Sequence, residues 1–251
     1  MCRVAYIQSN NIDRKLLAKL FEDLEKSAGG DGNGIGGFVD DKAFICKSAK
    51  APVADFAGAL IDRKWGNGFL FHTRRASVGS INNINCHPFI WGDTITIHNG
   101  HIDGFGVLKL MMIENLDKYA VDGWTLDKIV ATTDSDILAY FIWKRGFNIV
   151  SMMDCGTVIT MYSDKVKMYV GYCLEAIQVG ENWIYASEFS DEMGLSADQW
   201  LIFGKTTELT VYPDGQCTVD KGYYVDGVEL WKERQKKKKK NKNKYEVIEV
   251  A

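Results

Sequence analysis

The second residue of the chain, Cys2, could supply both the nucleophile and the base for hydrolysis of an amide. Its small side chain permits removal of Met1, which would leave a first residue that carries a thiol and a free α-amine. Because an α-amine has a pKa of about 7.7 to 8.0, it suits a general base near neutral pH. We therefore expect a mature chain that begins at Cys2, although this residue alone could also be an inert cysteine in a strand.

An Asn-Gly pair could supply the second requirement of such a reaction, which is a set of donors for the developing oxyanion. Asn99 and Gly100 follow a predicted strand and offer a side-chain amide and an unhindered backbone N–H. The same two residues are typical of a hairpin turn. Both interpretations can hold at once.

Four short segments follow Cys2 in a fixed order: HTRRASVG at 72–79, NCHP at 85–88, HNG at 98–100 and TDSD at 133–136. In this order and at this spacing they resemble the motifs of the class II glutamine amidotransferases of the N-terminal nucleophile hydrolase superfamily, which read roughly HTRxAT, NxHPF, HNG and TDSE. The resemblance implies that Cys2 attacks the side-chain amide of glutamine, that ammonia leaves, and that water hydrolyses the γ-glutamyl thioester.

Two further segments extend the resemblance along the chain. DGNGIG at 31–36 is similar to the DGWG segment of the small stand-alone branch of that family, and ASE at 186–188 is similar to a segment late in its sequence. The resemblance runs from Cys2 to Glu188 and is weaker to about Val219.

The resemblance assigns two charged residues to the amino-acid head of glutamine. Arg74 matches the residue that binds the α-carboxylate, and a guanidinium fork suits that bidentate contact. Asp134 matches the residue that binds the α-ammonium. Taken singly, Arg74 could be a surface ion-pair residue and Asp134 a helix cap.

The resemblance also assigns Asn99 and Gly100 to the oxyanion hole, and Ser77 and His87 to the substrate site. Ser77 stands where the family usually has threonine, so a hydroxyl is kept. The detailed shape of the pocket should differ from that of the family at two positions, where an aromatic residue and a histidine are common: Arg75 and Val78.

The partner of this activity is left open by the sequence. In family members that build amino sugars, asparagine or purines, a second domain consumes the ammonia, and the roughly 30 residues that follow the resemblance here are too few for one. The chain could deliver ammonia to a separate synthase partner, or act alone on glutamine or another γ-glutamyl compound, or be a catalytically silent binding module. No cofactor is implied.

Other possible sites are disfavoured by their spacing. A GxGxxG match at 32–37 follows a helix and leads into a strand, the reverse of a dinucleotide-binding segment. The four histidines and Cys86 form no HxxxH or CxxC pair, so we expect no metal site. Six scattered cysteines favour reduced thiols in a cytoplasmic protein.

The elements that must position these residues alternate between strand and helix patterns. We expect helices from an Asn11 cap to Gly29, from Pro52 to Ile61, and over 136–144 with Asp134 or Ser135 as cap. The expected strands, two of them joined at Asp40 and Asp41, cover residues 2–7, 32–39, 43–46, 69–73, 94–98, 158–162, 166–170, 209–212 and 216–219. This is an α+β class, and the resemblance specifies a four-layer αββα sandwich with Cys2 at the end of a central strand.

Composition separates a folded region from a basic tail. The 251 residues are 46% hydrophobic with a formal net charge of -3, yet residues 232–244 alone hold nine Lys or Arg and one Glu. We expect an amidotransferase domain over 1–230 and a tail without fixed structure over 231–251. Its composition favours a solubilising or linker tail, and contact with nucleic acid or another anionic partner is the less favoured alternative. The longest apolar run, 137–143, is too short to span a membrane, and the N-terminus has no targeting pattern.

Overall fold

The computed structural model describes residues 2–8, 13–59, 65–118, 133–190 and 199–228. The first half of the chain forms β1 (Arg3–Ile7), α1 (Arg14–Ala28), β2 (Asn33–Val39), β3 (Lys42–Ser48), α2 (Val53–Ala59), β4 (Trp65–Thr73), β5 (Phe89–Trp91), β6 (Thr94–Asn99) and α3 (Phe105–Lys118). The second half forms α4 (Asp134–Arg145), the 3-10 helix η2 (Phe147–Met152), β7 (Thr157–Met161), β8 (Val166–Val170), β9 (Leu174–Val179), β10 (Asn182–Ala186), β11 (Gln199–Phe203), β12 (Thr207–Val211), β13 (Cys217–Lys221) and β14 (Tyr224–Asp226).

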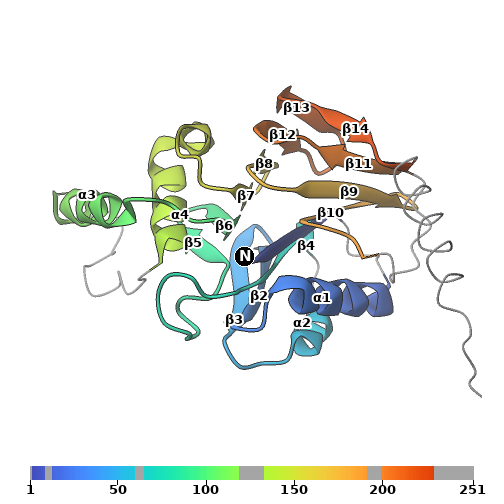
Figure 1. Ribbon diagram of the computed structural model, residues 1–251, viewed down its shortest axis with the longest axis horizontal. Helices are drawn as coiled ribbons and strands as arrows, with labels where there is room; N and C mark the ends of the chain where they lie inside the picture. The colour runs from blue at the N-terminus through green and yellow to red at the C-terminus, as the bar shows by residue number, and fades with distance from the viewer. Residues whose placement is uncertain (1, 9–12, 60–64, 119–132, 191–198, 229–251) are drawn as a thin grey trace, which may run out of the picture.

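The strands form two antiparallel sheets (Figure 1). The eight-stranded sheet has the order β14-β11-β9-β10-β1-β4-β2-β3, and the six-stranded sheet has the order β13-β12-β8-β7-β6-β5. Helices α1 and α2 lie beside the first sheet, α4 lies beside the second, and α3 packs against α4. The layers therefore follow one another as helix, sheet, sheet and helix.

Hydrophobic packing explains this layering, because β1 is buried on both faces. Ala5 and Ile7 pack toward α1 and α2, whereas Val4 and Tyr6 pack into the core between the two sheets. Side chains alternate along a strand, so four consecutive buried residues require cover on both sides of the sheet.

The expected αββα sandwich is confirmed, as are the hairpin of β2 and β3, the strands β6 to β8 and the helical segment that follows Thr133. Asp40 and Asp41 both have positive φ angles, 49° and 59°, as a tight turn between two strands requires. Helix α3 and strands β5, β9, β10, β11 and β14 were not individually predicted.

Two predicted helix caps are wrong. Helix α1 is capped by Asp13, whose side chain accepts a hydrogen bond from the backbone N–H of Lys15 at 3.0 Å. Helix α4 is capped by Thr133, whose Oγ1 accepts from the backbone N–H of Asp136 at 3.3 Å, so Asp134 is the first helical residue. A cap needs non-helical backbone, which Thr133 has and Asp134 lacks.

Several expectations fall on residues that the structure does not describe: Asn11, which Asp13 replaces as the cap of α1, the end of the second helix at Leu60 and Ile61, and the whole of the lysine-rich tail. In the part of the chain that is described, no helix is both long enough and apolar enough to cross a membrane.

Candidate active site

Cys2 lies immediately before β1, in the middle of the larger sheet. Its Sγ accepts a hydrogen bond from the backbone N–H of Arg75 at 3.3 Å. Burial raises the pKa of the Cys2 thiol, while the Arg75 N–H and the charge of Arg74 act in the opposite direction. Because burial is the largest effect, the thiol needs a base to form a thiolate at neutral pH.

Six of the seven predicted site residues line one small cavity of about 20 Å³: Cys2, Arg74, Ser77, His87, Gly100 and Asp134. The exception is Asn99, which lines a larger neighbouring cavity. The small cavity can hold one water-sized group, so an amino acid can enter only if part of its wall moves. Arg75 and Ser77 are the exposed residues of the lining, so the 75–80 segment provides the most solvent-exposed part of the wall.

Arg74 is buried, with 3% of its surface exposed, and is not the surface ion-pair residue of the simpler interpretation. Its guanidinium donates hydrogen bonds to the carbonyl oxygens of Val78 at 2.7 Å and Ser80 at 3.1 Å. Nearby, the Asp31 carboxylate accepts from the backbone N–H of Ala76 at 2.8 Å. These contacts hold the 75–80 segment in place beside the cavity. Arg74 therefore gives the site a positive charge and also fixes part of its wall.

Asp134 contributes a buried carboxylate to the lining of the same small cavity. Its Oδ2 accepts a hydrogen bond from the backbone N–H of Ile102 at 2.9 Å, and its Oδ1 accepts from that of Ser135 at 3.0 Å. The His101 ring lies 3.5 Å from the same carboxylate. Since Asp134 begins α4, its carboxylate also lies at the helix N-terminus, which carries a partial positive charge.

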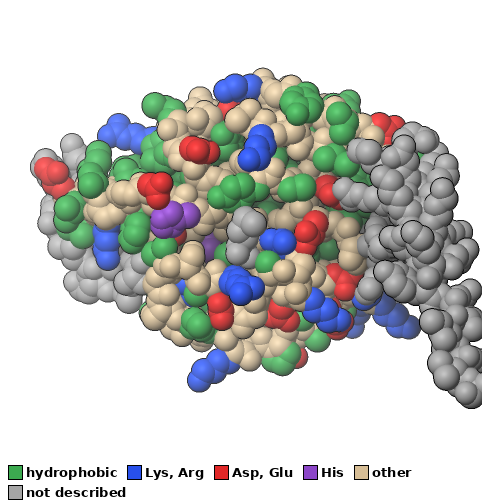
Figure 2. Space-filling view, in the orientation of Figure 1, with side chains coloured by type: hydrophobic (Ala, Val, Ile, Leu, Met, Phe, Trp, Pro, Cys, Tyr) green, Lys and Arg blue, Asp and Glu red, His purple; other side chains and the backbone are tan. Residues whose placement is uncertain are grey.

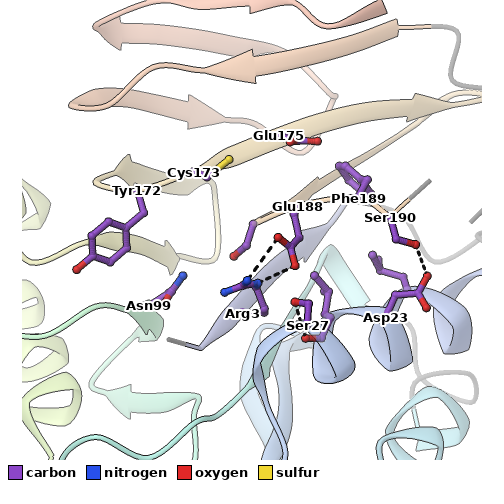
Figure 3. Close-up of a pocket in the computed structure, with 13 residues that line it drawn as sticks. Arg3, Asp23, Ser27, Asn99, Tyr172, Cys173, Glu175, Glu188, Phe189 and Ser190 are labelled. Atoms are coloured by element: carbon purple, nitrogen blue, oxygen red, sulfur yellow. Dashed lines mark hydrogen bonds and ion pairs between the residues drawn. The ribbon is translucent and has the colours of Figure 1, made fainter. Parts of the chain in front are cut away.

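Asn99 ends β6 and Gly100 follows it, but the next element is helix α3, so the pair is not the turn of a β-hairpin. The Asn99 side chain is 3% exposed, and its Oδ1 has no hydrogen-bond partner in the described part of the chain. Figure 3 shows its amide nitrogen directed toward the space between Tyr172 and Arg3. A Cβ on Gly100 would overlap the carbonyl oxygen of Cys155, which explains why glycine is needed there.

Three buried histidines lie at the small cavity: His87 and His98 line it, and His72 stacks on His87. Their rings are neutral. The rings of His72 and His87 stack with their centroids 3.7 Å apart. Burial lowers the pKa of His72 to about 3, and it also lowers the pKa values of His87 and His98. His98 is held by Ser135, whose Oγ lies 2.9 Å from Nδ1. Within the described ranges no three His, Cys, Asp or Glu side chains converge as metal ligands would.

Lys47, on β3, was not predicted to take part in the site. Its Nζ donates hydrogen bonds to three carbonyl oxygens, those of Ile84 at 3.1 Å, Cys86 at 2.8 Å and Pro88 at 3.1 Å. Burial lowers its pKa to about 8. This lysine therefore fixes the segment that carries His87, a role that no short motif around residue 47 could have indicated.

The larger cavity has a volume of about 650 Å³ and is lined by Arg3, the residue that follows Cys2 (Figure 3). Arg3 lines it, donates to the carbonyl oxygen of Cys2 at 3.1 Å and forms an ion pair with Glu188 at 2.9 Å. Ser187 accepts from the backbone N–H of Val4 at 3.0 Å. The ASE segment thus ties the end of β10 to the start of β1. Figure 2 shows basic and acidic side chains close together near the middle of this face.

Comparison with known proteins supports the fold. No protein-family model and no curated protein sequence matches the chain. A glutamine phosphoribosylpyrophosphate amidotransferase from B. subtilis, solved with ADP and GMP, superposes with a TM-score of 0.62 at 18% identity over 87% of this chain and 49% of its own. An allosteric regulatory enzyme of purine biosynthesis gives 0.64 at 18% identity over 87% and 49%. A glutamine aminotransferase class-II domain protein from Silicibacter pomeroyi gives 0.54 at 15% identity over 90% and 99%.

These identities are low, so the likeness concerns the fold, which is that of class II glutamine amidotransferase domains. The chain spans about half the length of the first two structures and nearly all of the third.

Replacing Gly100 with alanine should lower the free energy of unfolding by about 1 to 3 kcal/mol, because the new methyl group has no room beside the Cys155 carbonyl. Urea denaturation of the variant and the wild-type protein measures this loss. Gly106→Ala is the matched control, since a Cβ there meets open space within α3 and alanine favours a helix by about 1 kcal/mol. Equal stability of Gly100→Ala and the wild type would contradict the close approach.

Proposed function

We propose that this chain is an N-terminal cysteine amidohydrolase of the class II glutamine amidotransferase type, which releases ammonia from the side-chain amide of glutamine once Met1 is removed. One observation supports this function more than any other. A single cavity gathers a thiol, a buried guanidinium and a buried carboxylate, those of Cys2, Arg74 and Asp134. The thiol suits attack on the side-chain amide of glutamine. The guanidinium suits its α-carboxylate, and the carboxylate suits its α-ammonium.

In the proposed reaction, the free α-amine of Cys2 takes the thiol proton and the thiolate attacks the amide carbon. A C–S bond forms, and the carbonyl oxygen becomes an oxyanion that accepts hydrogen bonds from the Asn99 amide and the Gly100 N–H. The C–N bond then breaks, and ammonia leaves with the proton held by the α-ammonium. Water attacks the thioester, the C–S bond breaks, and glutamate is released with the thiol restored.

The charged partners of the substrate are already compensated in the free protein. Backbone carbonyl oxygens accept from Arg74, and backbone N–H groups donate to Asp134, so neither charge lies unpaired in a buried place. Under this proposal, the substrate's carboxylate replaces part of the carbonyl contacts of Arg74 as the 75–80 segment moves. Substrate binding and reshaping of the cavity wall are therefore one step.

The released ammonia has two possible fates under this proposal, release into solvent or transfer to a separate synthase bound to this chain. An experiment can distinguish release into solvent from transfer to a synthase, because adding a synthase partner should increase the rate of ammonia formation. A catalytically silent module of the same fold would release no ammonia in either case.

Cys2→Ala and Cys2→Ser should each lower ammonia release from glutamine by at least about 1,000-fold, because the nucleophile is removed or weakened while side-chain volume barely changes. A coupled assay of glutamate and ammonia measures turnover, and circular dichroism checks that the fold persists. Cys217→Ser, at an exposed cysteine on β13, is the matched control and should keep wild-type turnover. Unchanged turnover in Cys2→Ala would place the nucleophile elsewhere.

Asp134→Asn and Asn99→Ala should have different kinetic signatures. The substrate's ammonium is present throughout the reaction, so loss of its charged partner should raise KM for glutamine by about tenfold to a hundredfold with a smaller change in kcat. The oxyanion exists only near the transition state, so Asn99→Ala should lower kcat by about a hundredfold or more.

The control for the loss of a carboxylate is Asp103→Asn, at a fully exposed residue that also contacts His101. Steady-state kinetics with glutamine measures all three variants. An unchanged kcat in Asn99→Ala would remove Asn99 from the oxyanion hole.

A further inference from the structure

We propose that the larger cavity binds the leaving amine of the substrate, so that the preferred substrate is a γ-glutamyl amide of a cationic amine rather than glutamine itself. This inference rests on the proposed function and names the substrate class of that site. The larger cavity is the one lined by Arg3, Asn99, Tyr172 and Glu188.

The two cavities lie on either side of the proposed oxyanion donors. Gly100 lines the small cavity and its neighbour Asn99 lines the large one. If both residues donate to one oxyanion, the attacked carbon lies where the cavities meet. That carbon bears the glutamyl chain on one side and the amide nitrogen on the other. With the charged head beside Arg74, the proposed arrangement directs the nitrogen toward the large cavity, which Asn99 lines (Figure 3).

The size of the cavity argues for a leaving group larger than ammonia. Its volume of about 650 Å³ falls in the usual range for small-molecule sites, roughly 300 to 1,000 Å³. Ammonia needs about the volume of one water molecule, roughly 30 Å³. The cavity could therefore hold an amine with a chain of several atoms.

The chemistry of the lining indicates the charge of that amine. Three carboxylates but only one guanidinium line the cavity: Asp23, Glu175, Glu188 and Arg3. Arg3 is paired with Glu188 at 2.9 Å, and Asp23 is paired at 2.9 Å with Lys19, which does not line the cavity. The three carboxylates and these two cations together leave one excess negative charge at the cavity. Ser27, Tyr172 and Ser190 contribute hydroxyl groups to the lining, beside the apolar side chains of Leu20, Leu24 and Phe189. Such a surface favours a cationic or hydroxylated amine over an anionic one.

The reaction is the same hydrolysis with a different leaving group. The Cys2 thiolate forms the C–S bond, the C–N bond breaks, and the amine departs with the proton from the α-ammonium of Cys2. Water then cleaves the thioester to glutamate, so no further reactant is required.

The test compares three substrates by glutamate release: glutamine, the γ-glutamyl amide of 1,4-diaminobutane, and the γ-glutamyl amide of 4-aminobutyrate. The two amides have chains of similar length and opposite end charge. We expect kcat/KM for the diamine amide to exceed the values for glutamine and for the aminobutyrate amide by about tenfold or more.

A variant tests the location of the effect. Cys173→Trp fills part of the cavity from the turn before β9, and should lower the ratio of kcat/KM for the diamine amide to that for glutamine by about tenfold. Cys173→Ser is the matched control and should keep the ratio. If Cys173→Trp fails to fold, the comparison of the three substrates on the wild-type chain still tests the preference for a cationic leaving amine.

Each outcome has a definite meaning. Cys2-dependent hydrolysis of glutamine with no preference for the diamine amide would overturn this inference and leave the proposed function standing. Hydrolysis of none of the three substrates would overturn both.

Discussion

The antiparallel pairing of β1 with β4 is the constraint on which the site depends. Arg3 lies opposite Thr73 in this pairing, so the residues just beyond them, Cys2 and Arg74, emerge together at the same end of the sheet. Because β1 is buried on both faces and has a neighbour on each side, a slip of one residue would turn its whole buried pattern over. The register of β1 that buries its side chains in the two cores also places the Cys2 thiol near the Arg74 guanidinium.

The electrostatics of the site follow from the same packing. Burial keeps the histidines neutral and raises the pKa of the Cys2 thiol, so the charges near the thiol are mainly those of Arg74 and Asp134. Backbone carbonyl oxygens stabilise the Arg74 guanidinium, and backbone N–H groups stabilise the Asp134 carboxylate. The contacts of the described residues include no ion pair between Arg74 and Asp134. A zwitterionic head group can therefore be bound without first breaking a direct ion pair between the two, which would cost several kcal/mol in a buried place.

Much of the site was predictable from sequence, because motifs at strand ends report local chemistry. Cys2, Arg74 and Gly100 do line one cavity, and the roles assigned to them stay predictions. The layering could not be derived from periodicity, since a strand buried on both faces does not specify what covers it. Helix α3 was missed because Val107 and Leu110 are more than 60% exposed, which obscures an amphipathic pattern.

The larger cavity was invisible to sequence reasoning for a different reason. Its wall joins α1, the start of β1, the end of β6 and the segments around β9 and β10, which are adjacent only through the order of strands in the sheets. Lys47 was missed likewise, since its three carbonyl partners lie about 40 residues further along the chain.

The central claim is that the thiol and the α-amine of one residue, Cys2, carry out the chemistry. The most direct measurement is the intact mass of the purified, active protein before and after treatment with a glutamine-mimicking electrophile. The account predicts a chain that has lost Met1 and gains a single label at Cys2 as activity disappears. A fully active protein that retains Met1, or that loses activity with the label on another residue, would contradict it.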